Sequence, residues 1–166
     1  MEYRRIADNE IDQALDLVLK VFMEFEAPDY PPEGVRSFVS DVIENDSFKD
    51  GIRQGIFKML VAVDNGDIVG VMTLRNESHI MLAFVQKEYH KQGIGRTLFI
   101  HALQEICTSN DSISAITVNS SPYGVGFYEK LGFDATEKEQ EKHGIRYIPM
   151  KYLVEDITFK RNPSFD

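Results

Sequence analysis

The sequence predicts a single α/β domain built around a mixed β-sheet. Residues 64–67, Asp-Asn-Gly-Asp, separate two apolar runs, and a central Asn-Gly is typical of a two-residue β-hairpin joining antiparallel strands. Later, an apolar run at 80–85 is followed by a helical pattern and a third run at 114–118. A strand–helix–strand crossover of this length implies parallel strands. Antiparallel and parallel pairs in one chain together indicate a mixed sheet.

The N-terminal part predicts a short strand at 2–6 and then a long helix ending near residue 26. Asp8 or Asn9 is the expected cap of this helix, because both side chains can accept a hydrogen bond from a free amide in the first turn. Apolar residues recur on one face of the helix, as expected for packing against the sheet. These residues are Ile11, Leu15, Val18, Leu19 and Phe22.

Three prolines within residues 28–32 prevent the first helix from continuing, since proline lacks the amide that a helix needs. A second helix is predicted at 35–45, where apolar residues again recur at helical spacing. Residues 46–54 are polar, and we expect a loop there.

The second half begins with hairpin strands at 57–63 and 68–74 and a strand at 80–85 expected to be buried on both faces. A long helix should begin near Gly93, cross to the strand at 114–118, and be followed by a short helix that Gly132 stops. A last strand at 147–153 contains Pro149, which favours an edge or a bulge. The predicted order is β-α-α-β-β-β-α-β-α-β-β, in a domain spanning 1–153 with a polar tail at 154–166.

Composition narrows the class of protein. With 166 residues, 43% of them hydrophobic, the chain suits one globular domain, and its net charge of −9 argues against nucleic acid as a partner. The single cysteine, Cys107, excludes an internal disulfide, and we expect it to be buried. Neither a signal peptide nor a membrane-spanning run is recognisable, so we expect a cytoplasmic protein. We expect no metal site, and an exposed edge strand would permit a homodimer.

The start of the long helix has the features of an anion site. No Ser, Thr, Asp or Asn stands at Gly93 to cap the first-turn amides, and two glycines leave the backbone bare. Lys87, Lys91 and Arg96 surround this point with only Glu88 against them. Free amides beside cations at a helix N-terminus predict a phosphate-bearing ligand.

Two common phosphate motifs do not fit this stretch. A P-loop needs a lysine after its last glycine, where Arg96 stands, and a dinucleotide fingerprint needs a glycine or alanine where Leu98 stands. Instead, His-Lys-Gln-Gly-Ile-Gly at 90–95 resembles the pyrophosphate loop of the GNAT acyltransferases, Gln/Arg-x-x-Gly-x-Gly/Ala, with His90 in the first position. Asn119 and the sequence Phe-Tyr-Glu-Lys-Leu-Gly-Phe at 127–133 match a second landmark of that family.

The resemblance implies the GNAT fold over residues 3–153 and acetyl-CoA as the acyl donor. It places the pyrophosphate on the amides of 92–97, the pantetheine arm along the strand end at Phe84, and the polarised thioester carbonyl near the amide of Val85. Asn119 would orient the pantetheine arm. The cofactor-binding residues implied are Phe84, Val85, His90, Lys91, Gln92, Gly93, Ile94, Gly95, Arg96, Thr97 and Asn119.

Two catalytic residues are expected for acyl transfer to an amine. Tyr128, matched by the family motif, would protonate the leaving thiolate; the alternative is a half-buried tyrosine that only packs its helix. His79 lies on the same strand face as Val85, which makes it a candidate base; the alternative is a solvent-facing histidine at a strand end. Glu26 and Glu77 are the other candidate bases.

The acceptor wall is expected between the first two helices. Glu26, Asp29 and Tyr30 lie there in an acidic, aromatic segment that would suit a cationic amine such as a polyamine; the alternative is a solvated acidic loop. The predicted function is acetyl-CoA-dependent acetylation of a primary amine, small or peptidic, by direct attack in a ternary complex. The alternatives are another acyl group, an oxygen acceptor, or a CoA-binding regulatory module without turnover.

Overall fold

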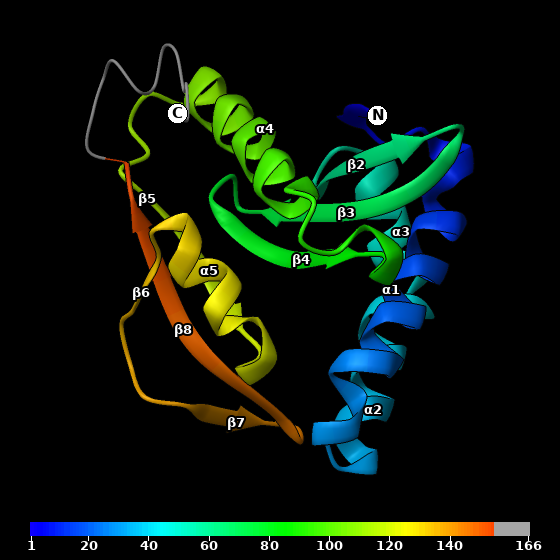
Figure 1. Cartoon of the computed structure of the whole chain (residues 1–166), viewed down its shortest axis with the longest axis vertical. Coiled ribbons are helices and arrows are strands. Elements are labelled where there is room, and N and C mark those ends of the chain that lie inside the picture. The colour runs from blue at the N-terminus through cyan, green and yellow to red at the C-terminus, as the bar shows by residue number, and fades with distance from the viewer. Residues whose placement is uncertain (155–166) are drawn as a thin grey trace.

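The computed structural model describes residues 1–154 and has the predicted mixed sheet (Figure 1). The sheet has eight strands, of which seven follow the order β1-β2-β3-β4-β5-β8-β6, while β7 pairs with β8. The pair β4–β5 is parallel, as predicted, and the others are antiparallel. The predicted tail at 154–166 lies outside the described residues except for its first residue, Val154, which is buried and donates its amide hydrogen bond to the carbonyl of Ser114.

The helices follow the predicted order with one addition, and three strands follow α5 where two were predicted. The strands are β1 Glu2–Arg5, β2 Lys58–Asp64, β3 Asp67–Arg75, β4 His79–Val85, β5 Ala115–Ser120, β6 Asp134–Ala135, β7 Gln140–Lys142 and β8 Ile145–Leu153. The helices are α1 Ile11–Phe25, α2 Pro32–Phe38, α3 Asp46–Arg53, α4 Ile94–Ser109 and α5 Val125–Leu131. Short 3₁₀ turns lie at Asp8–Glu10, Ala27–Asp29, Lys87–Tyr89 and Pro122–Gly124.

The addition is α3, where a loop was predicted, so that prediction was wrong. The side chain of Asn45 caps the helix by accepting a hydrogen bond from the amide of Phe48 at 3.0 Å. Phe48 and Ile52, one turn apart, are both buried against α1 and the sheet. The amphipathic signal is therefore present in the sequence, but polar residues outnumber the two apolar ones and obscure it.

The caps and ends of the first two helices also differ from expectation. Asp8 and Asn9 do not cap α1; they belong to a 3₁₀ turn closed by Glu10, whose carboxylate accepts from the amide of Ala7 at 3.0 Å. The same carboxylate is paired with Arg4, which lowers the pKa of Glu10 to about 2. The second helix begins three residues earlier than predicted and ends in a π-helical turn, Val39–Ile43.

The sheet separates two hydrophobic cores. On one face, α4 and α5 pack their apolar residues, including Leu98, Phe99 and Leu103, against the inner strands. On the other face, α1 and α3 contribute residues such as Leu15, Val18 and Phe48. Cys107 is buried in the first core, as expected.

The prediction for β8 was half right, because the strand lies inside the sheet and not at an edge. β8 pairs with β5 on one side and with β6 and β7 on the other. Pro149 stands where β6 has ended and β7 has not yet begun, and its carbonyl accepts from Thr136 on that side. In an antiparallel strand the N–H and C=O of one residue point the same way. The missing amide of Pro149 therefore falls in the gap between two short strands.

The sheet opens between β4 and β5, and this opening positions the site. The two strands pair only at His79–Thr117 and Ile80–Val118, after which they separate toward their C-terminal ends (Figure 1). Beyond this point β4 alternates between buried and half-buried side chains, so the expected burial on both faces was wrong. One side of the C-terminal half of β4 is left without a partner strand.

Candidate active site

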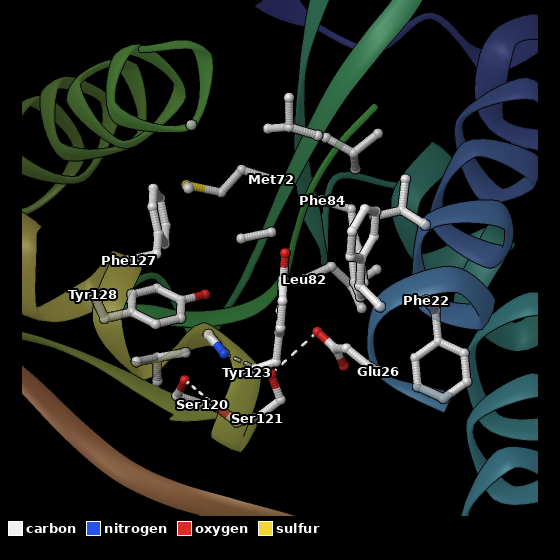
Figure 2. Close-up of a pocket in the computed structure, with 18 of the residues that line it drawn as sticks. Phe22, Glu26, Met72, Leu82, Phe84, Ser120, Ser121, Tyr123, Phe127 and Tyr128 are labelled. Carbon is white, nitrogen blue, oxygen red and sulfur yellow. Dashed lines mark hydrogen bonds between the residues drawn. The ribbon is translucent and has the colours of Figure 1, made fainter. Parts of the chain in front are cut away.

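A cavity of about 740 Å³ occupies the opening between β4 and β5. The end of α1, β4, the start of α4, the end of β5, α5 and the first residues of β8 line it. Figure 2 shows Tyr128 and Glu26 on opposite walls of this cavity, with Phe84 on the same side as Glu26. The separated strands therefore bring one phenol and one carboxylate into a common space.

The N-terminus of α4 has the bare backbone that the sequence predicts. Gly93 is its cap residue with φ of 80°, no side chain caps the helix, and a Cβ added at Gly93 would meet nothing within 4 Å. Lys91, Gly93, Ile94, Gly95 and Arg96 line the cavity. The open space and the first-turn amides are the features expected of a pyrophosphate site.

The two ends of this predicted site, Gln92 and Thr97, contribute differently. The amide of Thr97 already donates to the carbonyl of Gly93 at 2.9 Å, and its hydroxyl donates to the same carbonyl at 3.0 Å. The side-chain amide of Gln92 donates to the carbonyl of Glu88 at 2.9 Å. Neither residue lines the cavity, so the amides offered to a ligand come from residues between them.

Gly95 has a packing role that sequence reasoning missed. A Cβ at Gly95 would lie 2.9 Å from the ring of Phe127 on α5. The second glycine of the motif therefore lets α4 and α5 approach each other, while only Gly93 has open space and a positive φ. Gly93 therefore keeps the backbone open, whereas Gly95 permits close packing of two helices.

The end of β4 directs a main-chain amide into the cavity. The amide of Gln86 donates to Val69 on β3 at 2.8 Å, so in an alternating ladder the amide of Val85 points the other way, toward the opening. The carbonyl of Val85 points there too, and His90 Nε2 donates to it at 2.7 Å. This hydrogen bond connects the loop that precedes α4 to the end of β4. Val85 and Phe84 both line the cavity, as expected for a strand edge that receives a pantetheine arm.

Tyr128 and Asn119 both line the cavity. Tyr128 is only 6% exposed, and burial, with a smaller contribution from the nearby charge of Glu26, raises the pKa of its phenol. Its hydroxyl therefore holds its proton at neutral pH and can donate it. Asn119 lies near the end of β5, on the strand that leads to Tyr128 through a short turn.

Glu26 is the titratable carboxylate of the site. It follows the last turn of α1, and burial raises its pKa from 4.5 to about 7, against a lowering by the hydrogen bond from Ser121. The Ser121 hydroxyl donates to Glu26 at 3.1 Å and accepts from the amide of Gly124 at 3.1 Å (Figure 2). This pair joins α1 to the turn before α5. A carboxylate with a pKa near 7 is suited to taking up a proton at neutral pH.

The other candidate bases lie elsewhere. His79 is at the far end of β4, where its Nδ1 is 2.8 Å from the Thr117 hydroxyl and burial lowers its pKa to about 4. Glu77 accepts a hydrogen bond from Asn110 at 3.1 Å. Neither residue lines the cavity. His79 shares a strand face with Val85 but lies at the opposite end of β4, away from the cavity.

Of the other predicted acceptor residues, Tyr30 lines the cavity and Asp29 does not. Tyr30 lines the cavity beside Glu26, and its hydroxyl donates to the carbonyl of Arg146 at 3.3 Å. Asp29 is exposed and does not line the cavity. The β7–β8 hairpin supplies the remaining wall through Ile145, Arg146 and Tyr147, which no motif in the sequence indicates. Only tertiary contacts bring these residues beside α1.

Within residues 1–154, no group of His, Cys, Asp or Glu side chains is arranged to hold a metal ion. In the same part of the chain, every helix is too short or too polar to cross a membrane.

Comparison with known proteins agrees with this geometry. The family model described as the acetyltransferase (GNAT) domain matches residues 26–154. The chain belongs to the GNAT acetyltransferase family. A curated relative, the peptidyl-lysine N-acetyltransferase YjaB of Salmonella typhimurium, is 28% identical over 95 residues. That alignment covers 57% of this chain and 62% of the relative, so this GNAT chain spans less than two thirds of it.

Solved structures show the same GNAT fold. One is a GCN5-related N-acetyltransferase from Rhodopseudomonas palustris, with a TM-score of 0.75 and 19% identity over 92% of this chain and 95% of that one. Another is the PaiA N-acetyltransferase of Thermoplasma acidophilum in complex with coenzyme A, with a TM-score of 0.76 and 17% identity over 92% and 98%.

Proposed function

We propose that this protein transfers the acetyl group of acetyl-CoA to a primary amine by direct attack within a ternary complex. The observation that carries the proposal is the meeting of Glu26 and Tyr128 in one cavity, beside the bare start of α4. An N-acetyltransferase needs a proton acceptor for the amine, a proton donor for the thiolate and a site for the donor's phosphates. This cavity offers a candidate for each.

Acetyl-CoA is the acyl donor in this proposal. Support comes from the GNAT relative crystallised with coenzyme A and from Gly93, whose positive φ leaves the first turn of α4 open to a phosphate. The pantetheine arm would lie along Phe84 and Val85, and the amide of Val85 would polarise the thioester carbonyl. Asn119, on the opposite strand, would orient the arm.

Glu26 is the general base of the proposed mechanism, in place of His79. An alkylamine has a pKa of about 10 and reaches the enzyme mostly protonated. The ammonium group first loses one proton to solvent. Glu26 takes a second proton from the nitrogen as it attacks the thioester carbon, the C–S bond breaks, and Tyr128 protonates the sulfur. The proton held by Glu26 then returns to Tyr128 through solvent, which restores both groups. The amide and free coenzyme A are the products. The buried site strengthens both proton transfers because water is largely excluded.

The test measures release of free thiol from acetyl-CoA in the presence of primary amines. We expect turnover with at least one amine and none with the corresponding alcohol. Calorimetry with acetyl-CoA alone provides the second measurement. Donor binding without thiol release for any amine would refute the enzyme and favour a CoA-binding regulatory module. Faster release with a longer acyl-CoA would refute acetyl as the transferred group.

A further inference from the structure

The acceptor side of the cavity is walled by aromatic rings whose faces are already engaged. Phe22 stacks on Phe38 with ring centroids 3.8 Å apart and on Tyr30 at 5.9 Å. Phe25 stacks on Tyr123 at 5.5 Å. The negative face of a ring attracts cations, whereas its edge is positive. Stacking covers one face of each paired ring, and Lys87 Nζ lies over the ring of Phe25 at 6.0 Å, so few ring faces remain for a ligand cation and the wall is mainly apolar surface.

The charges of this wall favour only one ammonium group. Among the lining residues Glu26 is the single carboxylate, and the mechanism uses it at the reacting nitrogen. Glu24 is paired with Lys87, and Asp29 and Glu33 are exposed outside the lining. Arg146, which is paired with Glu139 at 3.2 Å, lines the same side. A second ammonium group would therefore lose water without gaining a carboxylate partner, which is costly away from solvent.

The β7–β8 hairpin bounds the cavity opposite α4. Figure 1 shows its tip reaching the region of α2. The backbones of Gly144 and Gly34 pack so closely that a Cβ on Gly34 would lie 2.3 Å from the Gly144 carbonyl oxygen. Ser37 donates to the carbonyl of His143 at 3.3 Å at the same contact. These contacts hold the hairpin against α2, and a cavity of about 740 Å³ is of the size that takes a small molecule.

We propose that the acceptor is a small primary monoamine with an aromatic or other apolar body and no second positive charge. This inference rests on the proposed acetyltransferase function and narrows its substrate class. It replaces the polyamine that the acidic segment of the sequence indicates, because only one of those acids faces the cavity. The reacting nitrogen lies at Glu26, and the apolar body packs against Phe25 and Phe38.

Matched amine pairs test the proposal. Hexylamine and 1,6-diaminohexane have the same chain and differ in a second amino group; phenethylamine and a short lysine-containing peptide complete the panel. We expect kcat/KM for thiol release to be about tenfold or more higher for hexylamine and phenethylamine than for the diamine, because the second charge must be desolvated. A preference for the diamine or the peptide would overturn the inference while leaving the acetyltransferase intact. Absence of release with every amine would overturn both.

A conservative variant gives an independent test of the wall. Phe38→Leu removes ring surface from the cavity, and kcat/KM for phenethylamine should fall about fivefold, with little change for ethylamine, whose body is too short to reach the ring. Met23→Leu, on the exposed side of α1 and 47% exposed, is the matched control and should change neither value. Equal losses for both amines in Phe38→Leu would assign the ring a purely structural role and overturn the proposed contact.

Discussion

Replacing Glu26 by glutamine is the sharpest test of the proposed mechanism. Glutamine has the same shape and keeps an oxygen that can accept the hydrogen bond from Ser121, so the link between α1 and the turn before α5 should survive. What disappears is the group that takes up the proton. General-base catalysis typically contributes about 10²- to 10⁴-fold to the rate, so we expect turnover to fall at least about 10²-fold.

The pH dependence follows from the environment of Glu26. Burial raises its pKa to about 7, and only the ionised form can act as a base. Expressed per neutral amine, wild-type kcat/KM should therefore fall below about pH 7, approaching tenfold per pH unit, and level off above it. Glu26→Gln should lose this acidic limb, because the glutamine side chain does not titrate.

Stability provides an independent measurement of the same pKa. A carboxyl group whose pKa rises from 4.5 to about 7 on folding favours the protonated folded state. Its contribution is fully present below pH 4.5 and is lost as the pH rises through about 7, at a cost of about 3 kcal/mol. Denaturant titrations should show wild type losing stability across this window and Glu26→Gln losing much less.

Glu24→Gln is the matched control, since Glu24 lies two residues earlier, is paired with Lys87 and does not line the cavity. It should retain the turnover and pH profile of wild type. If Glu26→Gln turned over at the wild-type rate with an unchanged acidic limb, the assignment of Glu26 as base would be refuted. Water or another group would then take the proton.

Four further changes test the rest of the site. Tyr128→Phe removes one hydroxyl and should lower turnover by about 10²-fold while acetyl-CoA affinity in calorimetry stays nearly constant; wild-type turnover would exclude it as the acid. Gly93→Val should strongly weaken acetyl-CoA binding, whereas Gly55→Val, with a similar positive φ and equally open space outside the cavity, should not; equal affinities would contradict the phosphate site. Gly144→Ala places a Cβ 2.7 Å from the amide nitrogen of Gly34 and should raise KM for the amine more than for acetyl-CoA. Asp29→Asn should leave amine KM unchanged, and a clear rise would return Asp29 to the acceptor site.

Local signals in the sequence were sufficient for much of the fold. Asn65 and Gly66 have φ of 51° and 90°, as the Asn-Gly hairpin requires, and Gly132 ends α5 with φ of 101°. The apolar stripe of α4 and its crossover correctly predicted the parallel pair. These predictions succeed because turn geometry and helical burial depend on neighbours within a few residues.

The errors in the fold arose where a distant partner decided the outcome. α3 looks polar in sequence, yet Phe48 and Ile52 find burial against α1 and the sheet. Pro149 indicated an edge, but the gap between β6 and β7 accommodates it inside the sheet. In both cases the outcome depends on tertiary contacts that the local sequence pattern does not contain.

The sequence by itself determined the family resemblance, the bare start of α4 and the candidate acid Tyr128, because each depends on a contiguous motif. Only the tertiary structure decided which acid of the segment between α1 and α2 faces the cavity. Helix and loop orientation turned Glu26 inward beside Ser121 and left Asp29 exposed. The separation of β4 from β5 likewise left His79 at the paired end and Val85 at the open one. Burial and distance, which a linear pattern does not encode, raise the pKa of Glu26 to about 7 and leave His79 outside the cavity.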